Sequence, residues 1–296
     1  MQTKNRLLVT GVSGHYGRIA ASHLLEHHHA SHLIGTTRTP ARARDLADLG
    51  LDIRHADFDT PSTLASAFSG AQRMLLTSTA AEHAGPRRVQ QHRHAIDAAR
   101  AAGVAHIVYS SFLAAEDSAL AALAADHAAT ERALRETGVD HTVLRHAFYM
   151  EMLLPTVQRA LVTGVLRTLD AHAGVAYVAR ADCALAGACA LLSGRGGAVL
   201  DITGPRSVSP VELARIMHVC LGASIEVEEV SPDALLAGFV ADGTSQPMAG
   251  ILVYLARGMA QGAMKSVSHD FQRLTGREAC GVEQFLMQHR DLLRAA

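Results

Sequence analysis

Three glycines at a fixed spacing are the sharpest chemical signal in the sequence. The segment Thr10-Gly-Val-Ser-Gly-His-Tyr-Gly17 follows an apolar run and opens an expected helix. Glycine permits a tight turn and a close approach of a ligand to the backbone, and the first N–H groups of a helix attract phosphate. A turn that only lets strand and helix pack closely is the alternative, but the place between a first strand and a first helix favours a pyrophosphate site. The residues expected to bind a dinucleotide here are Gly11, Ser13, Gly14, His15, Tyr16 and Gly17.

The end of the second expected strand should select between two forms of the dinucleotide. An acidic residue there would bind a ribose 2′-hydroxyl, but this strand ends Thr36-Thr37-Arg38. A guanidinium suits a 2′-phosphate, because it can donate two parallel hydrogen bonds and stack on adenine. We therefore expect NADP(H) as the cofactor and Arg38 as the main determinant. Arg42 and Arg44 are expected to lie at a solvated helix start.

Residues after the third and fourth expected strands complete the predicted cofactor site. Asp57 and Phe58 are placed to meet the adenine, whereas Asp59 or Thr60, directly before Pro61, has the residue type of a helix N-cap. The predicted cofactor contacts beyond the glycine turn and Arg38 are therefore Asp57, Phe58 and, at the end of the fourth strand, Thr77.

These residues need a scaffold, and the first half of the sequence predicts one. Short apolar runs alternate strictly with helical segments, which predicts a parallel sheet covered on both faces. Crossovers of this length form right-handed βαβ units. The expected strands are 6–10, 32–37, 51–55, 74–78, 105–111 and 141–145, and the expected helices are 16–28, 41–49, 61–68, 86–102 and 119–137.

After about residue 148 the alternation becomes less regular. The pattern predicts one or two further strands on the same sheet and a smaller, mostly helical lobe. The expected strands are 198–203 and 225–230, and the expected helices are 182–192, 211–221, 232–240, 250–262 and 282–293.

Composition excludes several classes of protein. The chain has 296 residues, of which 49% are hydrophobic, so it can bury a full core and is not disordered. With 27 basic and 28 acidic residues it lacks the basic footprint of a nucleic-acid-binding protein. The four cysteines form no CxxC pair, and no signal peptide or membrane span is evident. We expect a cytoplasmic protein, monomeric or homodimeric, with neither nucleic acid nor membrane as a partner.

Several motifs together resemble the NmrA-like group of atypical short-chain dehydrogenase/reductases, and in particular its quinone oxidoreductase 2 and triphenylmethane reductase types. They are the glycine turn, Thr37-Arg-Thr-Pro40, His106-Ile-Val-Tyr-Ser-Ser111, His127-Ala-Ala-Thr-Glu131, Leu144-Arg145 and Leu274-Thr-Gly-Arg277. The resemblance implies an α/β, Rossmann-type, doubly wound parallel sheet. It divides the chain into an NAD(P)-binding Rossmann domain, residues 1–150, and residues 151–296, which hold additional sheet elements and a C-terminal substrate lobe.

One departure from the wider superfamily bears on catalysis. Standard members place a Tyr four residues before a Lys on the helix after the fifth strand, where one helical turn puts both on the same face. Here the Lys position holds His127 and the Tyr position holds Leu123. Hydride transfer does not need the missing acid, because the cofactor supplies the hydride. The resemblance gives His127 a role at the ribose or in the active site, and a half-buried structural histidine is the alternative.

Three residues are candidates for the catalytic role: Ser110, His127 and Tyr149. Ser110 ends the fifth strand at the carboxyl edge, where folds of this kind build their sites, whereas Tyr109 alternates to the other side and is expected to pack. Tyr149 could donate a hydrogen bond or stack on an aromatic substrate. Alternatively, no side chain protonates the product, and a quinone or phenolic ketone takes its proton from water or from its own hydroxyl.

The segment after the sixth strand is expected to line a substrate pocket. It resembles the family's nicotinamide-pocket segment, with His146 where an Asn is common. Apolar and aromatic side chains there could form an adaptable wall, although any single one of them could equally be core. The predicted substrate-binding residues are Phe112, His146, Phe148, Tyr149 and Met152.

Histidine clusters elsewhere are weaker signals. His23 and His27 lie one helical turn apart and could hold a metal, but with 18 histidines in the chain such pairs arise by chance, and we expect no metal site. His92 and His94 are expected at the surface of the helix after the fourth strand.

These features predict an NADPH-dependent reductase that transfers hydride to a quinone, or to a ketone on an aromatic or polycyclic small molecule. Ketoreductases that tailor polyketide-type compounds are one such class. A non-catalytic NADP-binding regulator that senses redox state is the alternative, and the missing Tyr favours it somewhat. A sugar-nucleotide epimerase or dehydratase ranks last, because it would normally need the Tyr–Lys pair.

Overall fold

The computed structural model describes residues 6–80, 83–113, 119–194 and 196–294. Strands and helices alternate through the first half of the chain, as the sequence predicts. The strands are β1 (Arg6–Thr10), β2 (Leu33–Thr37), β3 (Asp52–His55), β4 (Ala71–Leu76), β5 (His106–Phe112) and β6 (Asp140–His146). The helices are α1 (His15–His27), α2 (Arg44–Asp48), α3 (Leu64–Phe68), α4 (Pro86–Ala101) and α5 (Ala121–Thr137).

The central sheet has seven parallel strands in the order β3-β2-β1-β4-β5-β6-β8, where β8 is Ala198–Ile202. The order reverses between β1 and β4, which is where doubly wound sheets bind their ligands. The register places Thr10 beside Thr36 and Val9 beside Leu75. The Rossmann-type α/β fold expected from the sequence is confirmed.

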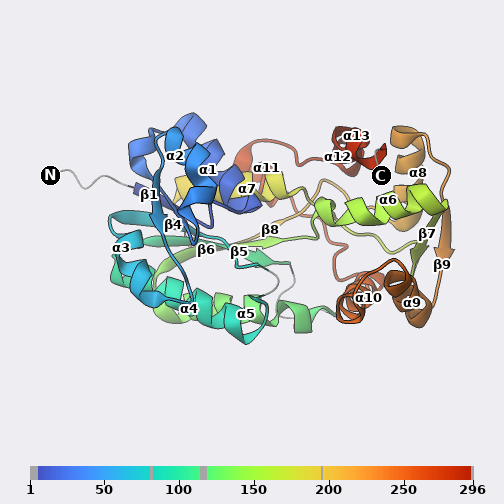
Figure 1. The fold of residues 1–296 in the computed structure, drawn as a ribbon, viewed down its shortest axis with the longest axis horizontal. Coiled ribbons are helices and arrows are strands. Elements are labelled where there is room, and N and C mark those ends of the chain that lie inside the picture. The colour runs from blue at the N-terminus through green and yellow to red at the C-terminus, as the bar shows by residue number, and fades with distance from the viewer. Residues whose placement is uncertain (1–5, 81–82, 114–118, 195, 295–296) are drawn as a thin grey trace.

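Helices cover both faces of this sheet (Figure 1). On one face α3, α4 and α5 pack on alternate strand residues such as Leu8, Met74 and Ile107. On the other face α1, α2 and α7 (Arg180–Ser193) pack on residues such as Val9 and Val108. Because both faces are buried, the strands read as continuous apolar runs rather than as alternating ones.

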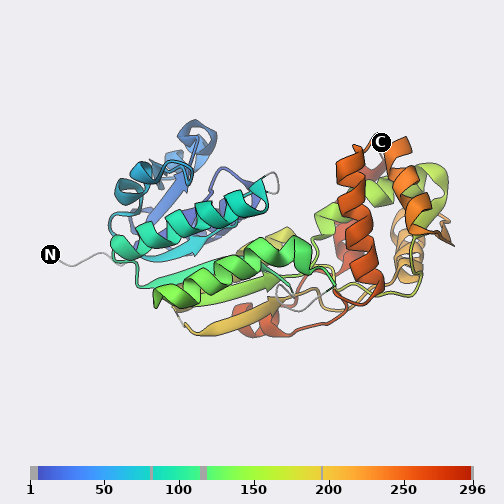
Figure 2. The same cartoon turned by 90° about the horizontal axis from the view of Figure 1, so that it is seen from below.

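The second half of the chain returns to the sheet and also builds a lobe beyond the carboxyl ends of β6 and β8 (Figures 1 and 2). The sheet gains β8, α7 and α11 (Asp270–Thr275). The lobe holds a two-stranded parallel sheet of β7 (Val165–Thr168) and β9 (Glu226–Glu229). Its helices are α6 (Leu154–Thr163), α8 (Pro210–Leu221), α9 (Pro232–Ala241), α10 (Gln246–Ala260), α12 (Val282–Gln288) and α13 (Arg290–Arg294). The division at residue 150 stays a prediction.

Some element predictions need correction. The sequence pattern does not predict α6, β7 or α11, and the single helix expected over 282–293 is two helices, α12 and α13. The N-cap predicted before Pro61 is confirmed in its position, but its side chain makes no capping hydrogen bond. Thr60 occupies that position without a side-chain cap, and the Asp59 carboxylate instead accepts hydrogen bonds from Arg87 and Gln91.

Among the described residues, no helix combines the length and the apolar character that crossing a membrane requires.

A buried carboxylate joins α5 to two neighbouring strands. The Glu131 side chain is fully buried and accepts hydrogen bonds from the Ser111 hydroxyl of β5, at 2.6 Å, and from two nitrogens of Arg145 of β6, at 2.7 and 3.1 Å. Charge-assisted hydrogen bonds of this kind are stronger than neutral ones, and they hold α5 against the strand ends that carry Ser110 and His146.

We therefore expect Glu131→Ala to lower the free energy of unfolding by about 3 kcal/mol, because it leaves Arg145 beside a vacated, buried position. Urea unfolding followed by circular dichroism measures this. Glu136→Ala, on the exposed side of the same helix, is the control and should change stability by no more than about 0.5 kcal/mol. Equal effects of the two substitutions would show that the buried network does not stabilise the fold.

Candidate active site

The glycine turn between β1 and α1 has the geometry of an anion cradle. Gly11 has φ +66°, and a Cβ there would lie 2.7 Å from the Thr77 hydroxyl oxygen; a Cβ on Gly17 would lie 2.5 Å from the Gly11 carbonyl. The protein itself therefore requires these two glycines. A Cβ on Gly14 would meet only the Gly11 carbonyl, at 3.4 Å. Space over Gly14 is thus open to a ligand.

The N-terminus of α1 is also left without a counter-charge. Gly14 occupies its N-cap position and offers no side-chain acceptor, and the first turn carries no acidic residue. The N–H groups of His15, Tyr16 and Gly17 and the positive end of the helix dipole are therefore suited to a phosphate group. The residues present fit the pyrophosphate of a dinucleotide.

Hydroxyl groups tie this turn to its neighbours. The Ser13 and Thr37 hydroxyls lie 2.6 Å apart, which joins the turn to the end of β2. The Thr77 hydroxyl donates to the Thr10 carbonyl, at 2.9 Å, and the Thr77 N–H donates to the Thr10 hydroxyl. The ends of β1, β2 and β4 are thereby fixed around the glycine turn.

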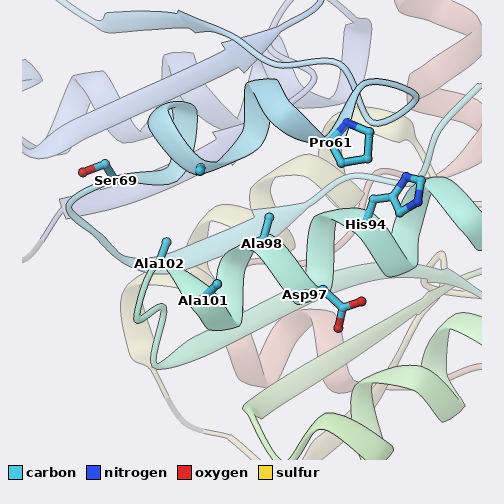
Figure 3. A pocket seen from close by; sticks show the side chains of 8 residues that line it. Pro61, Ser69, His94, Asp97, Ala98, Ala101 and Ala102 are labelled. Atoms are coloured by element: carbon cyan, nitrogen blue, oxygen red, sulfur yellow. The ribbon is translucent and has the colours of Figure 1, made fainter.

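The residues predicted at the adenine end lie on the rim of the sheet. Arg38 is exposed directly after β2. The Asp57 carboxylate accepts a hydrogen bond from the Asp59 N–H, and half-buried Phe58 packs on the α3–α4 side, where His94 contacts its carbonyl at 2.8 Å. Figure 3 shows a surface pocket here, between α3 and α4, with Pro61 and His94 at one end and Ser69 and Ala102 at the other.

Ser110 is buried at the end of β5, and its hydroxyl is already engaged. Its oxygen accepts a hydrogen bond from the Ser78 N–H at 2.8 Å, and the hydroxyl donates a longer one, 3.5 Å, to the Ser78 side chain. Ser110 thus holds the segment after β4 against β5.

His127 stands at the centre of a polar network on α4, α5 and β5. Its Nε2 lies 3.2 Å from Nη1 of Arg88, which also binds the Asp126 carboxylate at 2.9 Å. Since a guanidinium can only donate, Nε2 must accept, and the ring proton must sit on Nδ1. Nδ1 therefore donates to the Tyr109 hydroxyl oxygen, at 2.9 Å. Burial lowers the pKa of His127 to about 4, with Arg88 acting in the same direction, so the imidazole is neutral at pH 7.

His92 contradicts the prediction of a surface histidine. Its ring is fully buried, its Nε2 accepts from the Thr79 N–H at 3.1 Å, and its Nδ1 then donates to the Thr130 hydroxyl at 2.9 Å. Burial holds its pKa well below the usual value. Sequence alone could not show this, because both partners lie on other elements.

A second cluster lies where β6 ends beside the start of α1. The His146 ring lies 5.4 Å from the Tyr16 ring, and its Nδ1 lies 3.0 Å from the Tyr149 hydroxyl. Burial, followed by the field of His127, lowers the pKa of His146 to about 3. Its buried Nε2 has no hydrogen-bond partner among the described residues. A buried polar atom left unpaired costs about 1–3 kcal/mol, a cost usually found at functional sites.

Two charged groups flank this cluster that the sequence analysis does not identify. The Arg180 guanidinium carbon lies 5.2 Å from the centre of the Tyr149 ring. The Glu151 carboxylate accepts a hydrogen bond from the backbone N–H of Arg180. Burial holds the pKa of Tyr149 well above its usual value, and Arg180 opposes that shift. Tyr149 is therefore a protonated phenol at neutral pH.

The structure brings some of the predicted substrate contacts together and separates others. The Phe112 ring lies 6.0 Å from the His127 ring, and the Phe148 ring lies 6.2 Å from that of Tyr177. Met152, in the same segment, is 47% exposed. Tyr109 packs in the core as expected, and its hydroxyl is also hydrogen-bonded to the His127 imidazole.

Three potential metal ligands converge away from these clusters. Side-chain atoms of His23, Glu26 and His27 lie within 4.8 Å of one another, on partly to fully exposed residues at the C-terminal end of α1. The helix separates them from the glycine turn by roughly 15 Å at 1.5 Å per residue.

Comparison with known proteins agrees with this geometry. A family model described as NAD(P)H-binding matches residues 11–191. Quinone oxidoreductase 2 of Escherichia coli is 31% identical over 91% of this chain and 93% of its own. An NmrA-like family domain-containing oxidoreductase of Aspergillus flavus, flvB, is 28% identical over 97% of this chain and 96% of its own. The structure of Citrobacter sp. triphenylmethane reductase complexed with NADP(H) has a TM-score of 0.89 at 29% identity, and covers 96% of this chain and 99% of its own.

Arg38→Ala should weaken NADPH binding by about 10- to 100-fold, because it removes charge-assisted hydrogen bonds to the 2′-phosphate. NADH binding should change little, so the ratio of the two dissociation constants is the measurement, by fluorescence titration. Arg44→Ala is the matched control and should preserve the ratio. A ratio unaffected by Arg38→Ala would exclude this residue as the determinant.

The low pKa of His146 predicts acid sensitivity. Below the pKa of about 6.5 of an unfolded histidine, the unfolded chain binds a proton that the folded protein refuses, so stability falls as the pH drops. His146→Asn should therefore make the free energy of unfolding less steep between about pH 6 and pH 4, by about 1.4 kcal/mol per pH unit. Urea unfolding across that range measures the slopes, and identical slopes would contradict the assignment.

Proposed function

Since this chain belongs to the NAD(P)H-binding family and is an NAD(P)H-dependent oxidoreductase, we propose that it is an NADPH-dependent reductase of small aromatic molecules. Its substrate is a quinone, or a ketone on an aromatic or polycyclic framework. The bound cofactor supplies a hydride to the electrophilic carbon. The chain's own residues bind both partners, exclude water and manage the proton.

One observation carries the proposal: the helix that follows the cofactor turn contacts the imidazole–phenol cluster at the carboxyl edge of the sheet. Tyr16 belongs to the first turn of α1, which follows the glycine cradle, and its ring lies 5.4 Å from His146 at the end of β6. Tyr16 is itself held by the hydrogen bond that its hydroxyl donates to the Cys183 carbonyl of α7, at 2.9 Å. A dinucleotide seated on the turn would therefore reach the cluster that contains Tyr149.

The character of the surrounding side chains supports an aromatic substrate. Phe112 and Phe148 come from the ends of β5 and β6, and Tyr149 adds a ring that already carries a cation on one face. Aromatic rings favour stacked or edge-on contact with other rings. Two of the similar proteins are named as a quinone oxidoreductase and a triphenylmethane reductase, which supports the same class of substrate.

The standard Tyr–Lys pair is replaced in this proposal. Leu123 and His127 stand at the positions that the resemblance assigns to it. His127 keeps a neutral ring between Arg88 and Tyr109, so it orders the site rather than carrying a positive charge to the ribose. Ser110, His127 and Tyr149 are the side chains considered for proton donation, and water or the substrate's own hydroxyl is the other source.

The missing tyrosine at position 123 also supports a second candidate function, a non-catalytic NADP-binding regulator. The two candidates differ in turnover and not in cofactor binding, because both use the glycine turn.

Titration with NADPH and NADH, followed by NADPH consumption against quinones, aromatic ketones and cationic dyes, tests the proposal. We expect tighter binding of NADPH than of NADH and turnover of at least one class in the panel. Tight NADPH binding without turnover across the panel would contradict the reductase and favour the regulator.

Gly14→Val tests whether the cofactor binds at the glycine turn. The protein leaves room for a side chain here, and the backbone of Gly14 is extended, so the fold should persist. NADPH affinity should fall by at least about tenfold, because the new side chain blocks close approach to the helix N-terminus. Unchanged affinity with an unchanged melting temperature would place the cofactor elsewhere.

A further inference from the structure

Tyr149 is held more rigidly than a residue of a substrate-facing loop needs to be. The backbone on either side of it is hydrogen-bonded to the segment that precedes α7: the Met150 N–H donates to the Val178 carbonyl, and the Val178 N–H donates to the Phe148 carbonyl. At the end of β6, the Ala147 N–H donates to the Ile202 carbonyl of β8. The phenol is thus fixed relative to His146 and to Arg180.

The other two side chains considered as proton donors are already committed. The Ser110 oxygen accepts from the Ser78 N–H, and its hydroxyl is directed to the Ser78 side chain. The His127 ring carries its one proton on Nδ1, where it is donated to Tyr109, and its Nε2 is capped by Arg88. Of the three, Tyr149 alone has a hydroxyl whose side-chain contact among the described residues is limited to His146.

The ring of His146 makes a single hydrogen bond among the described residues. Its ring is almost completely buried, Nδ1 contacts the Tyr149 hydroxyl at 3.0 Å, and Nε2 has no partner among the described residues. A buried ring that leaves one nitrogen unpaired is a poor choice for stability alone, since an apolar side chain would avoid that cost. The contact with Tyr149 therefore accounts for the presence of an imidazole at this position.

We propose that Tyr149 is the proton donor of the reductase, and that His146 and Arg180 are positioning residues that stabilise its phenolate. His146 donates Nδ1–H to the phenol oxygen, which leaves the phenol O–H free to point at the substrate. The Arg180 guanidinium lies over the face of the same ring and supplies the positive charge. This inference rests on the proposed function.

Two electrons enter the substrate as a hydride on carbon, and the C=O electron pair moves onto the oxygen. The Tyr149 O–H bond breaks, and its proton forms the new O–H bond of the product. The phenolate that remains is held by the N–H of His146 and the charge of Arg180, and a solvent proton restores the phenol.

The geometry gives a conservative and a disruptive replacement for His146. The nitrogen that contacts Tyr149 is bonded to Cγ, and the amide nitrogen of Asn is also bonded to Cγ and always carries protons. His146→Asn can therefore keep the hydrogen bond, whereas His146→Phe keeps the ring shape and removes it. Tyr254→Phe, in α10 of the lobe, is the control for the loss of a tyrosine hydroxyl elsewhere.

Turnover of a panel substrate should separate these variants. Tyr149→Phe should lower kcat by about 100- to 10,000-fold, the usual effect of losing a general acid. His146→Phe and Arg180→Gln should each lower it by about tenfold or more, and His146→Asn should remain within about threefold of the parent protein, as should Tyr254→Phe. NADPH affinity and melting temperature, measured for every variant, identify any that is misfolded.

A second readout needs no turnover. With tyrosine labelled at Cζ with carbon-13, the resonance absent from Tyr149→Phe belongs to Tyr149 and reports the hydrogen bond to its oxygen. His146→Phe should shift this resonance in the NADPH-bound protein, and His146→Asn should leave it near its original position.

The outcomes are distinguishable. Full activity of Tyr149→Phe, or equal activity of His146→Phe and His146→Asn with equal Cζ shifts, would overturn this inference and leave the reductase intact, with water or the substrate as the proton source. Absence of turnover by the parent protein across the panel would instead overturn the proposed function, and the acid role of Tyr149 with it.

Discussion

The reversal of strand order between β1 and β4 is the constraint on which the rest of the site depends. Neighbouring crossovers leave in opposite directions there, which makes the carboxyl ends of the two strands the usual place for a ligand in doubly wound sheets. The glycine turn follows β1 at this point, and β5 and β6 lie beyond β4 in the same sheet. Residues far apart in the chain, from Gly11 to Tyr149, are collected at one edge because each follows a parallel strand.

Three neutral histidine side chains lie near this edge of the sheet. His92 and His146 are buried and His127 is half-buried, and burial lowers the pKa of each. For His92 and His127, an obligatory donor on Nε2 fixes the proton on Nδ1: the Thr79 N–H in one case and Arg88 in the other. These rings therefore act as fixed hydrogen-bond donors rather than as proton carriers. His146 differs from them, because nothing in the described protein occupies its Nε2.

The sequence predicts the parallel sheet well, because strand and helix periods are local properties and glycine and proline mark the boundaries. It does not predict α6 or β7, which lie where the sequence pattern of strands and helices becomes less regular. The polar networks are harder still. Arg88 reaches Asp126 across 38 residues, and Arg180 reaches Tyr149 from the start of α7, so residue type alone could not pair them. Tyr109 shows how far strand alternation predicts a side chain. The alternation correctly predicts that its ring is in the core, but it does not predict the hydrogen bond between its hydroxyl and His127.

The position of α7 has a consequence for the order in which the protein is made. This helix covers β4, β5 and β6 and packs along α1, yet it lies at Arg180–Ser193, well after those elements in the chain. Until it has emerged from the ribosome, apolar residues such as Leu75 and Val108 have no cover on that face of the sheet. The cofactor cradle is likewise incomplete, because Tyr16 is anchored on Cys183. The nascent chain therefore exposes this apolar face of the sheet during synthesis until α7 has been made.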